Sequence, residues 1–203
     1  MRVTTIHSTV ALWVFVSSPS FALAQTALPL GAVALVNGDR YGSLVALCAE
    51  TGEPAVHQGS KIIRGTAVWA GEGSNLKRIH AGLGACDPSW SPDGQRLAVT
   101  AAEGLWIFPS NSPDGALRVE SRSPFGSIES NYRAFSSPRW SPDGMLLALV
   151  VTNGGTSWVE VFEADSGRLF YTSPPENDTF SWTAARELKL GVLEIRLSSL
   201  SRR

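Results

Sequence analysis

The sequence predicts an all-β fold built from repeated antiparallel sheets. A five-residue motif, Trp-Ser-Pro-Asp-Gly, stands at residues 90–94 and returns unchanged at residues 140–144. The copies lie 140 − 90 = 50 positions apart, and a period of about this size is typical of propellers and solenoids. Apolar runs of strand length follow both copies, and 19 Gly and 12 Pro residues provide for many turns. Together these observations predict a partial or short β-propeller of about 3–4 four-stranded antiparallel blades.

Each copy of the motif has the composition of a tight turn. The motif residues are Trp90, Ser91, Pro92, Asp93 and Gly94 in the first copy and Trp140, Ser141, Pro142, Asp143 and Gly144 in the second. Pro restricts φ, Ser and Asp side chains bond to the nearby backbone, and Gly tolerates positive φ. Apolar residues follow at 97–99 and 146–151. The motif therefore predicts a hairpin whose second strand is buried on both faces.

The remainder of each unit supplies further strands. Strand-like segments follow the motif copies at 105–108, 117–119, 158–162 and 169–171, and a unit upstream has them at 33–36, 44–47, 66–69 and 76–79. The predicted blades cover roughly residues 31–80, 86–120, 136–173 and 179–197. The last blade is expected to be incomplete, because Ala184-Ala185-Arg186 replaces the Pro-Asp-Gly turn.

The longest link without a strand pattern runs from Arg122 to Ser137 and contains Ser123-Pro124 and Ser136-Ser137. Loops on a rigid scaffold commonly carry recognition. We therefore expect this link to be an exposed loop whose sequence determines what the domain binds.

The repeated strings resemble a known family. PSWSPDGQRLAV at residues 88–99, PRWSPDGMLLAL at 138–149 and GEGSNLKRI at 71–79 resemble the WD40-like propeller repeats of TolB-type periplasmic proteins. The resemblance covers roughly residues 31–190. Similar repeats form the propeller domains of prolyl-oligopeptidase-like peptidases. TolB-type rings close with more blades than this chain has residues for, so the resemblance implies the repeat class more strongly than the function.

The N-terminus has the pattern of a secretory signal peptide over residues 1–24. Arg2 precedes the apolar run 10–16, and Ala22-Leu23-Ala24 places small residues before Gln25. This pattern predicts cleavage between Ala24 and Gln25 and a domain of residues 25–203 in the periplasm or outside the cell. The alternative is a buried N-terminal strand. The apolar run is too short for stable membrane insertion.

Charge gives no support for a nucleic-acid partner. Residues 1–24 hold one Arg and no acid, so residues 25–203 carry 17 − 1 = 16 basic and 18 acidic side chains and a net charge of −2. Such a balance provides no long-range attraction to phosphate backbones.

Cys48 and Cys86 are the two cysteines of the chain. In an oxidising compartment an isolated pair is a candidate disulfide. Two separate buried thiols are the alternative, because free Cys packs as a small hydrophobic residue.

The sequence gives no positive sign of catalysis. It holds no recognisable nucleophile elbow, phosphate-binding loop or metal-ligand motif, so we expect no enzyme activity, cofactor or metal. His57 and His80 are interpreted as surface or turn histidines rather than catalysts. Asp93 and Asp143 could suggest acid–base or metal chemistry, but an Asp between Pro and Gly is explained by the turn.

Tryptophans recur at similar places in the units. They are Trp69, Trp90, Trp106, Trp140, Trp158 and Trp182. A carbohydrate- or peptide-gripping set is one interpretation. We favour core packing, because large aromatic residues fill the wedge between twisted sheets.

The hypothesis that fits these features is a secreted or periplasmic, non-catalytic protein-interaction module. By resemblance to TolB-type proteins, its partner would be an envelope or secreted protein. The alternatives are an accessory or truncated propeller of a prolyl-oligopeptidase-like hydrolase and a remnant of a longer propeller protein. Unpaired edge strands also predict self-association that closes the ring.

Overall fold

The structure is a computed structural model that describes residues 28–53, 56–58, 61–84, 86–101, 104–110, 112–119 and 133–197. The predicted signal peptide and its cleavage site at Ala24 and Gln25 lie outside these residues. No helix in the described ranges has the length and apolar character that a membrane crossing requires.

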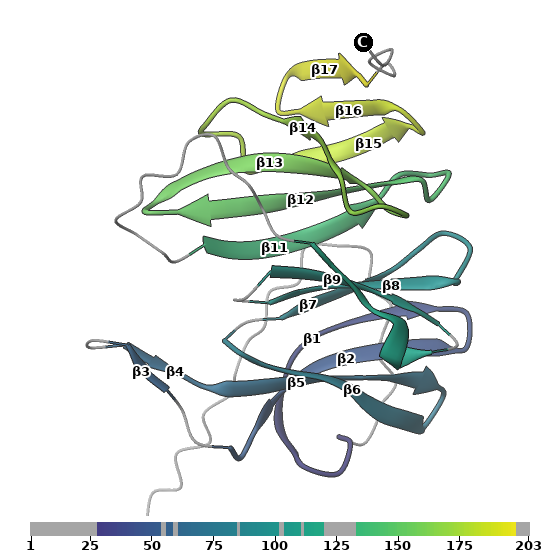
Figure 1. Cartoon of the computed structure of the whole chain (residues 1–203), viewed down its shortest axis with the longest axis vertical. Helices are drawn as coiled ribbons and strands as arrows, with labels where there is room; N and C mark the ends of the chain where they lie inside the picture. Colours follow the sequence, from purple (N-terminus) through teal and green to yellow (C-terminus); the bar gives the residue numbers. More distant parts are fainter. Residues whose placement is uncertain are drawn as a thin grey trace, which may run out of the picture.

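Four antiparallel sheets follow one another along the long axis of the molecule (Figure 1). The first consists of β1 (Ala32–Tyr41), β2 (Leu44–Thr51), β5 (Gly65–Glu72) and β6 (Asn75–Leu83). The second consists of β7 (Asp87–Trp90), β8 (Arg96–Ala101), β9 (Gly104–Pro109) and β10 (Leu117–Val119), with the short 3-10 helix η1 (Pro113–Gly115) before β10. The third consists of β11 (Arg133–Trp140), β12 (Leu146–Asn153), β13 (Thr156–Glu163) and β14 (Leu169–Thr172). The fourth consists of β15 (Phe180–Ala184), β16 (Glu187–Leu190) and β17 (Leu193–Arg196).

Strands that are consecutive within a sheet lie side by side, so each sheet is an antiparallel meander. The first strands of neighbouring sheets touch, since β1 contacts β7, β7 contacts β11 and β11 contacts β15. Sheets that converge on their first strands are arranged as propeller blades. The predicted all-β fold with several four-stranded antiparallel blades is confirmed.

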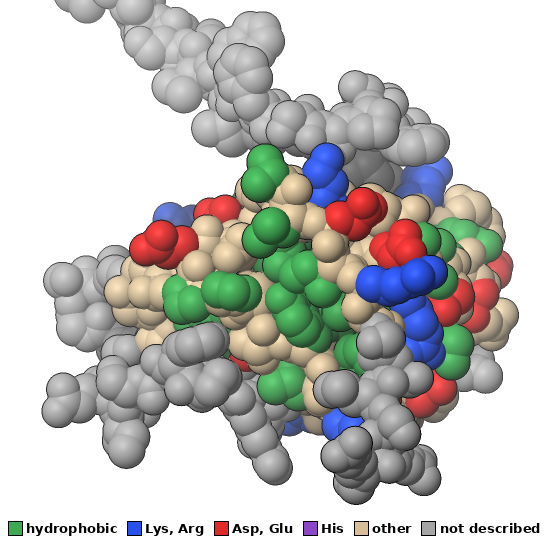
Figure 2. Space-filling view, turned by 90° about the horizontal axis from the view of Figure 1, so that it is seen from above, with side chains coloured by type: hydrophobic (Ala, Val, Ile, Leu, Met, Phe, Trp, Pro, Cys, Tyr) green, Lys and Arg blue, Asp and Glu red, His purple; other side chains and the backbone are tan. Residues whose placement is uncertain are grey.

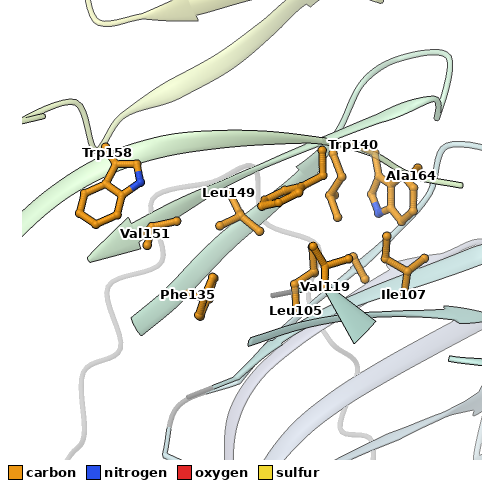
Figure 3. Packing of buried hydrophobic residues seen from close by; sticks show 12 residues of the cluster. Leu105, Ile107, Val119, Phe135, Trp140, Leu149, Val151, Trp158 and Ala164 are labelled. Carbon is orange, nitrogen blue, oxygen red and sulfur yellow. The ribbon is translucent and has the colours of Figure 1, made fainter. Parts of the chain in front are cut away.

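The cores lie between successive sheets. In the cluster between the second and third sheets, residues of β9 and β10 lie opposite residues of β11 and β12 (Figure 3): Leu105, Ile107, Val119, Phe135, Trp140 and Leu149. Similar clusters join the first sheet to the second and the third to the fourth. The central strand β12 is buried on both faces over residues 146–151, as its continuous apolar run predicted.

The structure corrects the predicted link at residues 122–137. Residues 133–137 belong to β11, which pairs with β12 from Arg133↔Asn153 onward. The register shifts between Ser136 and Arg139, and Ser137 has a φ of 53°. Ser136 and Ser137 were interpreted as part of an irregular link, but β12 provides a pairing partner for this segment. A bulge admits Pro138 because an unpaired residue needs no backbone donor.

A hairpin that the sequence analysis did not predict is inserted between β2 and β5. It consists of β3 (Val56–Gln58) and β4 (Lys61–Ile63) and projects from the side of the first sheet (Figure 1).

Candidate functional site

The first strands bring together a polar group of side chains that the sequence analysis missed. This inner-strand cluster comprises Asn37, Asp39, Asp87, Ser137 and Arg139, from β1, β7 and β11. Three of its members follow the period of the motif, since 87 − 37 = 50 and 137 − 87 = 50. That shared spacing is the signal that could have revealed it.

The Asp87 carboxylate connects three sheets. Asn37 Nδ2 of β1 donates a hydrogen bond to Asp87 Oδ1, and the backbone N–H of Ser137 in β11 donates to Asp87 Oδ2 at 2.8 Å. Both carboxylate oxygens therefore accept hydrogen bonds from neighbouring sheets. The Asp87 carboxylate therefore helps to hold β1, β7 and β11 in position relative to one another.

Burial raises the pKa of Asp87 above its ordinary value of 3.8. The hydrogen bond from Ser137 and the charge of Arg139 lower this pKa, while the charge of Asp39 raises it further. The desolvation of the charged form is the largest of these effects. The fold therefore raises the proton affinity of the Asp87 carboxylate.

A second carboxylate of the cluster is bound to the backbone of the next sheet. The N–H of Trp90 donates to Asp39 Oδ2 at 2.6 Å. Asp39 and Asp87 thus both serve contacts between sheets, which explains why carboxylates stand on the first strands of the first and second sheets.

The two motif copies form the same hydrogen-bond network. The hydroxyl of Ser91 donates to Asp93 Oδ1 at 2.5 Å and accepts from the N–H of Arg96 at 2.9 Å. The second copy repeats this with Ser141 and Asp143 at 2.6 Å and with the N–H of Leu146 at 2.9 Å. Both serines are fully buried. The motif closes each hairpin by satisfying its own backbone groups, which is what the turn interpretation of the aspartates expects.

The pKa values of both motif aspartates lie below 3.8. For Asp93, the hydrogen bond from Ser91 is the main cause. For Asp143, desolvation is the largest single cause and raises the pKa, but hydrogen bonds from Ser141 and from the N–H of Met145 act together with the charge of Arg186 to lower it overall. Both side chains are therefore anionic turn residues at neutral pH, each serving its own hairpin.

Tryptophan side chains also join the sheets. The indole N–H of Trp140 donates to the carbonyl oxygen of Ser89 at 2.9 Å, and that of Trp182 donates to the carbonyl oxygen of Arg139 at 3.0 Å. The Trp90 Nε1 atom is buried and has no hydrogen-bond partner within the described residues.

Most of the recurring tryptophans lie in the cores. The buried ones are Trp69, Trp90, Trp140 and Trp158. Trp106 and Trp182 are half-buried. Trp106 packs against the cluster between the first and second sheets, and Trp182 packs against the cluster between the third and fourth sheets. Their positions agree with packing between sheets.

Arg96 of the second sheet holds the motif turn of the third. Its guanidinium donates to the carbonyl oxygen of Gly144 at 2.7 Å and forms an ion pair with Asp165 at 2.5 Å. The guanidinium carbon also lies 5.0 Å from the centre of the Trp140 ring, a cation–π arrangement.

Cys48 and Cys86 form a disulfide. Cys48 lies in β2 and Cys86 directly precedes β7, so the bond joins the first sheet to the second. Both residues are buried, with exposed fractions of 0% and 4%. The position of the bond between two blades makes it a structural crosslink.

The two histidines in the described residues belong to different strands. His57 belongs to the projecting strand β3, whereas the ring of His80 in β6 lies 4.4 Å from the ring of Trp106. Within the described ranges, no group of three or more His, Cys, Asp or Glu residues has an arrangement that could hold a metal ion.

No family model and no curated protein matches the chain. Solved structures do show similarity. The β-propeller domain of the Trilobed protease from Pyrococcus furiosus has a TM-score of 0.54 at 16% identity and covers 77% of this chain and 47% of that chain. An acylaminoacyl peptidase from Pyrococcus horikoshii has a TM-score of 0.50 at 12% identity and covers 76% and 27%. TolB from Acinetobacter baumannii has a TM-score of 0.50 at 13% identity and covers 78% and 37%.

At these identities the similarity concerns the fold. The chain spans less than half the length of each of these structures. The expected likeness to TolB is supported at the level of the propeller architecture. The described chain therefore has the fold of part of a β-propeller.

Proposed function

We propose that this chain is a secreted or periplasmic, non-catalytic propeller module that binds another protein. The observation that carries the proposal is an uneven distribution of exposed apolar side chains. The large hydrophobic residues that are exposed in the described ranges are Leu28, Leu30, Val33, Leu35, Val36, Tyr41, Met145, Val192 and Leu193. Five of these nine lie between Leu28 and Val36. Concentrated exposed apolar surface is typical of protein contact sites.

The place of this segment in the fold suits a docking surface. It leads into and includes the first half of β1, an edge strand of the first sheet. Val33 is 62% exposed although it belongs to a strand. β1 contacts β7 of the second sheet, but Val33, Leu35 and Val36 in its first half remain exposed. The first sheet also stands at one end of the stack (Figure 1), so a partner could reach this half of β1 without displacing another sheet.

The similarity to TolB and to protease propellers supports a binding role by analogy of fold. The use of both motif aspartates within their own hairpins supports a non-catalytic role. The secretory signal pattern supports a location outside the cytoplasm.

Photo-crosslinking in the native host tests the proposal. A benzoylphenylalanine residue is placed at Val33 or at Leu35, and as a control at Met145, which is 53% exposed but lies in a motif turn. We expect one discrete adduct from both β1 positions, with the same partner by mass spectrometry, and none from Met145. No adduct at β1, or the same adduct at all three positions, would overturn the proposal. A hydrolase as the captured partner would instead favour the accessory-propeller alternative.

A further inference from the structure

Within the described residues, β17 of the fourth sheet is an edge strand without a neighbour on its outer side, and this side is called the free edge. Each of the first three sheets has four strands, whereas the fourth has three and ends with β17. β16 and β17 form a hairpin with a two-residue turn, flanked by the pair Leu190↔Leu193. In such a hairpin the flanking pair is hydrogen-bonded, and hydrogen-bonded pairs then recur at every second position. The N–H of Leu197 continues this alternation by donating to the carbonyl oxygen of Arg186 at 2.7 Å.

The alternation identifies which backbone groups face outward. Leu193, Ile195 and Leu197 direct their N–H and C=O groups toward β16. Glu194 and Arg196 direct theirs to the opposite side, where no described strand lies. The free edge therefore presents the N–H and C=O groups of these two residues, and an unpaired edge of this kind pairs readily with another strand.

The side chains of β17 divide between two faces. Ile195 packs against the cluster between the third and fourth sheets, and Leu197 is buried there. Leu193 lies on the same face of the strand as Ile195 and Leu197, but its side chain is 59% exposed. Glu194 and Arg196 point to the opposite face, where Arg196 forms an ion pair with Glu187 at 3.3 Å. Figure 2 looks onto this end of the molecule and shows an apolar patch beside neighbouring acidic and basic side chains.

The order of these side chains is symmetric about Ile195. Residues 193–197 read Leu-Glu-Ile-Arg-Leu, which is apolar, acidic, apolar, basic, apolar. An antiparallel partner with the same sequence, centred on the same residue, places Glu194 opposite Arg196 of the other strand, and Arg196 opposite Glu194. We propose that β17 pairs with β17 of a second copy of this chain, about a two-fold axis at Ile195.

This register satisfies the backbone and the side chains together. The outward groups of Glu194 bond those of Arg196 in the second copy, so all the free groups of the edge gain partners. Opposite charges face each other across the junction, an arrangement that stabilises strand pairs. Leu193 lies opposite Leu197 of the second copy and loses its exposure. A two-fold contact between identical patches is the commonest form of protein self-association.

The pairing differs from closure of a ring by two half rings. Ring closure would place the outer face of the fourth sheet against another sheet. By strand pairing that face carries mainly polar residues: Ser181, Glu187, Lys189, Glu194 and Arg196, with Ala184 beside the register shift of β15. The faces between successive sheets are apolar. The free edge, not the outer face, therefore has the chemistry of a contact with a second copy.

Sedimentation of the secreted chain over a range of concentrations tests the pairing. The single variants Glu194→Arg and Arg196→Glu put like charges opposite each other, so we expect each to weaken the dimer at least about tenfold. A mixture of the two variants restores opposite charges and should form heterodimers. Asp178→Arg is the matched control, because it changes an exposed acidic residue by the same charge away from the edge and should dimerise like the parent.

A cysteine crosslink tests the register. In the proposed dimer Ile195 faces itself, so Ile195→Cys should give a disulfide-linked dimer, whereas Leu193→Cys faces Leu197 and should not. A parent chain that stays monomeric at all concentrations would overturn the inference. So would single charge variants that dimerise like the parent, or equal crosslinking at both cysteine positions. None of these results would affect the proposed contact of β1 with another protein, because the two surfaces lie on different sheets.

Discussion

The indole N–H of Trp140 donates its hydrogen bond to the carbonyl oxygen of Ser89, the residue directly before Trp90. Trp182 makes the equivalent bond to Arg139, the residue directly before Trp140. The third and fourth sheets are thus each fastened to the preceding sheet by the tryptophan of their first strand. Trp90 occupies the same place in the second sheet, but its indole N–H has no partner within the described residues.

Trp140→Phe should destabilise the chain by about 1 kcal/mol beyond the effect of Trp90→Phe, because the first change removes the buried hydrogen bond to the carbonyl oxygen of Ser89. Trp90→Phe removes a donor that makes no such bond and is the matched control for lost ring volume. Chemical unfolding followed by circular dichroism gives both free energies. Equal losses would show that the hydrogen bond adds nothing to packing.

The motif glycines have different surroundings. Gly94 and Gly144 have φ values of +69° and +70°, so alanine is strained at either position. A Cβ at Gly94 would also lie 2.6 Å from two ring carbons of Tyr41, whereas at Gly144 the nearest atom is 3.5 Å away.

We expect Gly144→Ala to cost roughly 1 kcal/mol and Gly94→Ala roughly 1–3 kcal/mol more, owing to the overpacking. Thermal melts should rank the two variants in this order. In a Tyr41→Ala background the two alanine substitutions should have similar effects. If Gly94→Ala remained more destabilising than Gly144→Ala in this background, contact with the Tyr41 ring would not be the cause of the difference.

The motif aspartates should make the fold sensitive to acid. Because the folded-state pKa values of Asp93 and Asp143 lie below 3.8, their contribution to stability is present above the unfolded value and is lost as pH falls through the folded values. Replacing both by Asn should flatten the decline in unfolding free energy between about pH 5 and pH 2. Urea titrations at several pH values measure the slope, and an unchanged slope would contradict the assignment.

Asp87 should act in the opposite direction. Its folded-state pKa is raised above 3.8, so its contribution to stability is present below the unfolded value and is lost as pH rises through the folded value. The stability of the parent relative to Asp87→Asn should therefore fall as pH rises through the range just above 3.8. NMR titration of the Asp87 carboxyl provides a direct check. A midpoint below 3.8 would contradict the dominance of desolvation.

Removal of the disulfide by Cys48→Ala together with Cys86→Ala should destabilise the chain by about 4 kcal/mol, on the chain-entropy model for a separation of 38 residues. Denaturant unfolding with and without reductant measures the effect. Reductant should lower the midpoint of the parent and leave that of the double variant unchanged. A parent that is insensitive to reductant after unfolding and refolding would contradict the crosslink.

Local sequence features predicted the hairpins well because the turn residues act within a few positions. Ser91 and Asp93 bond to groups of their own turn, so their effect is visible in a short window. Repetition of that window identified the sheets. The start of β11 could not be identified in the same way, because residues 133–137 are strand only through pairing with β12.

The inner-strand cluster was missed for a related reason. Asn37, Asp87 and Ser137 are different residue types, and no local pattern marks any of them as a site. Their relationship exists because the 50-residue period places them beside one another in three first strands. Short polar residues at equal spacing could be sought in other repeats of this kind.

The disulfide makes the two ends of the stack of sheets unequal in stability. The first and second sheets are covalently joined, while in the described chain the fourth sheet packs against the third alone. In arrays of this kind each unit is stabilised by its neighbours, so in the monomer the end without a crosslink should unfold first. A protease acting on the native chain would then trim it from the C-terminal side and leave the first two sheets as the most durable fragment.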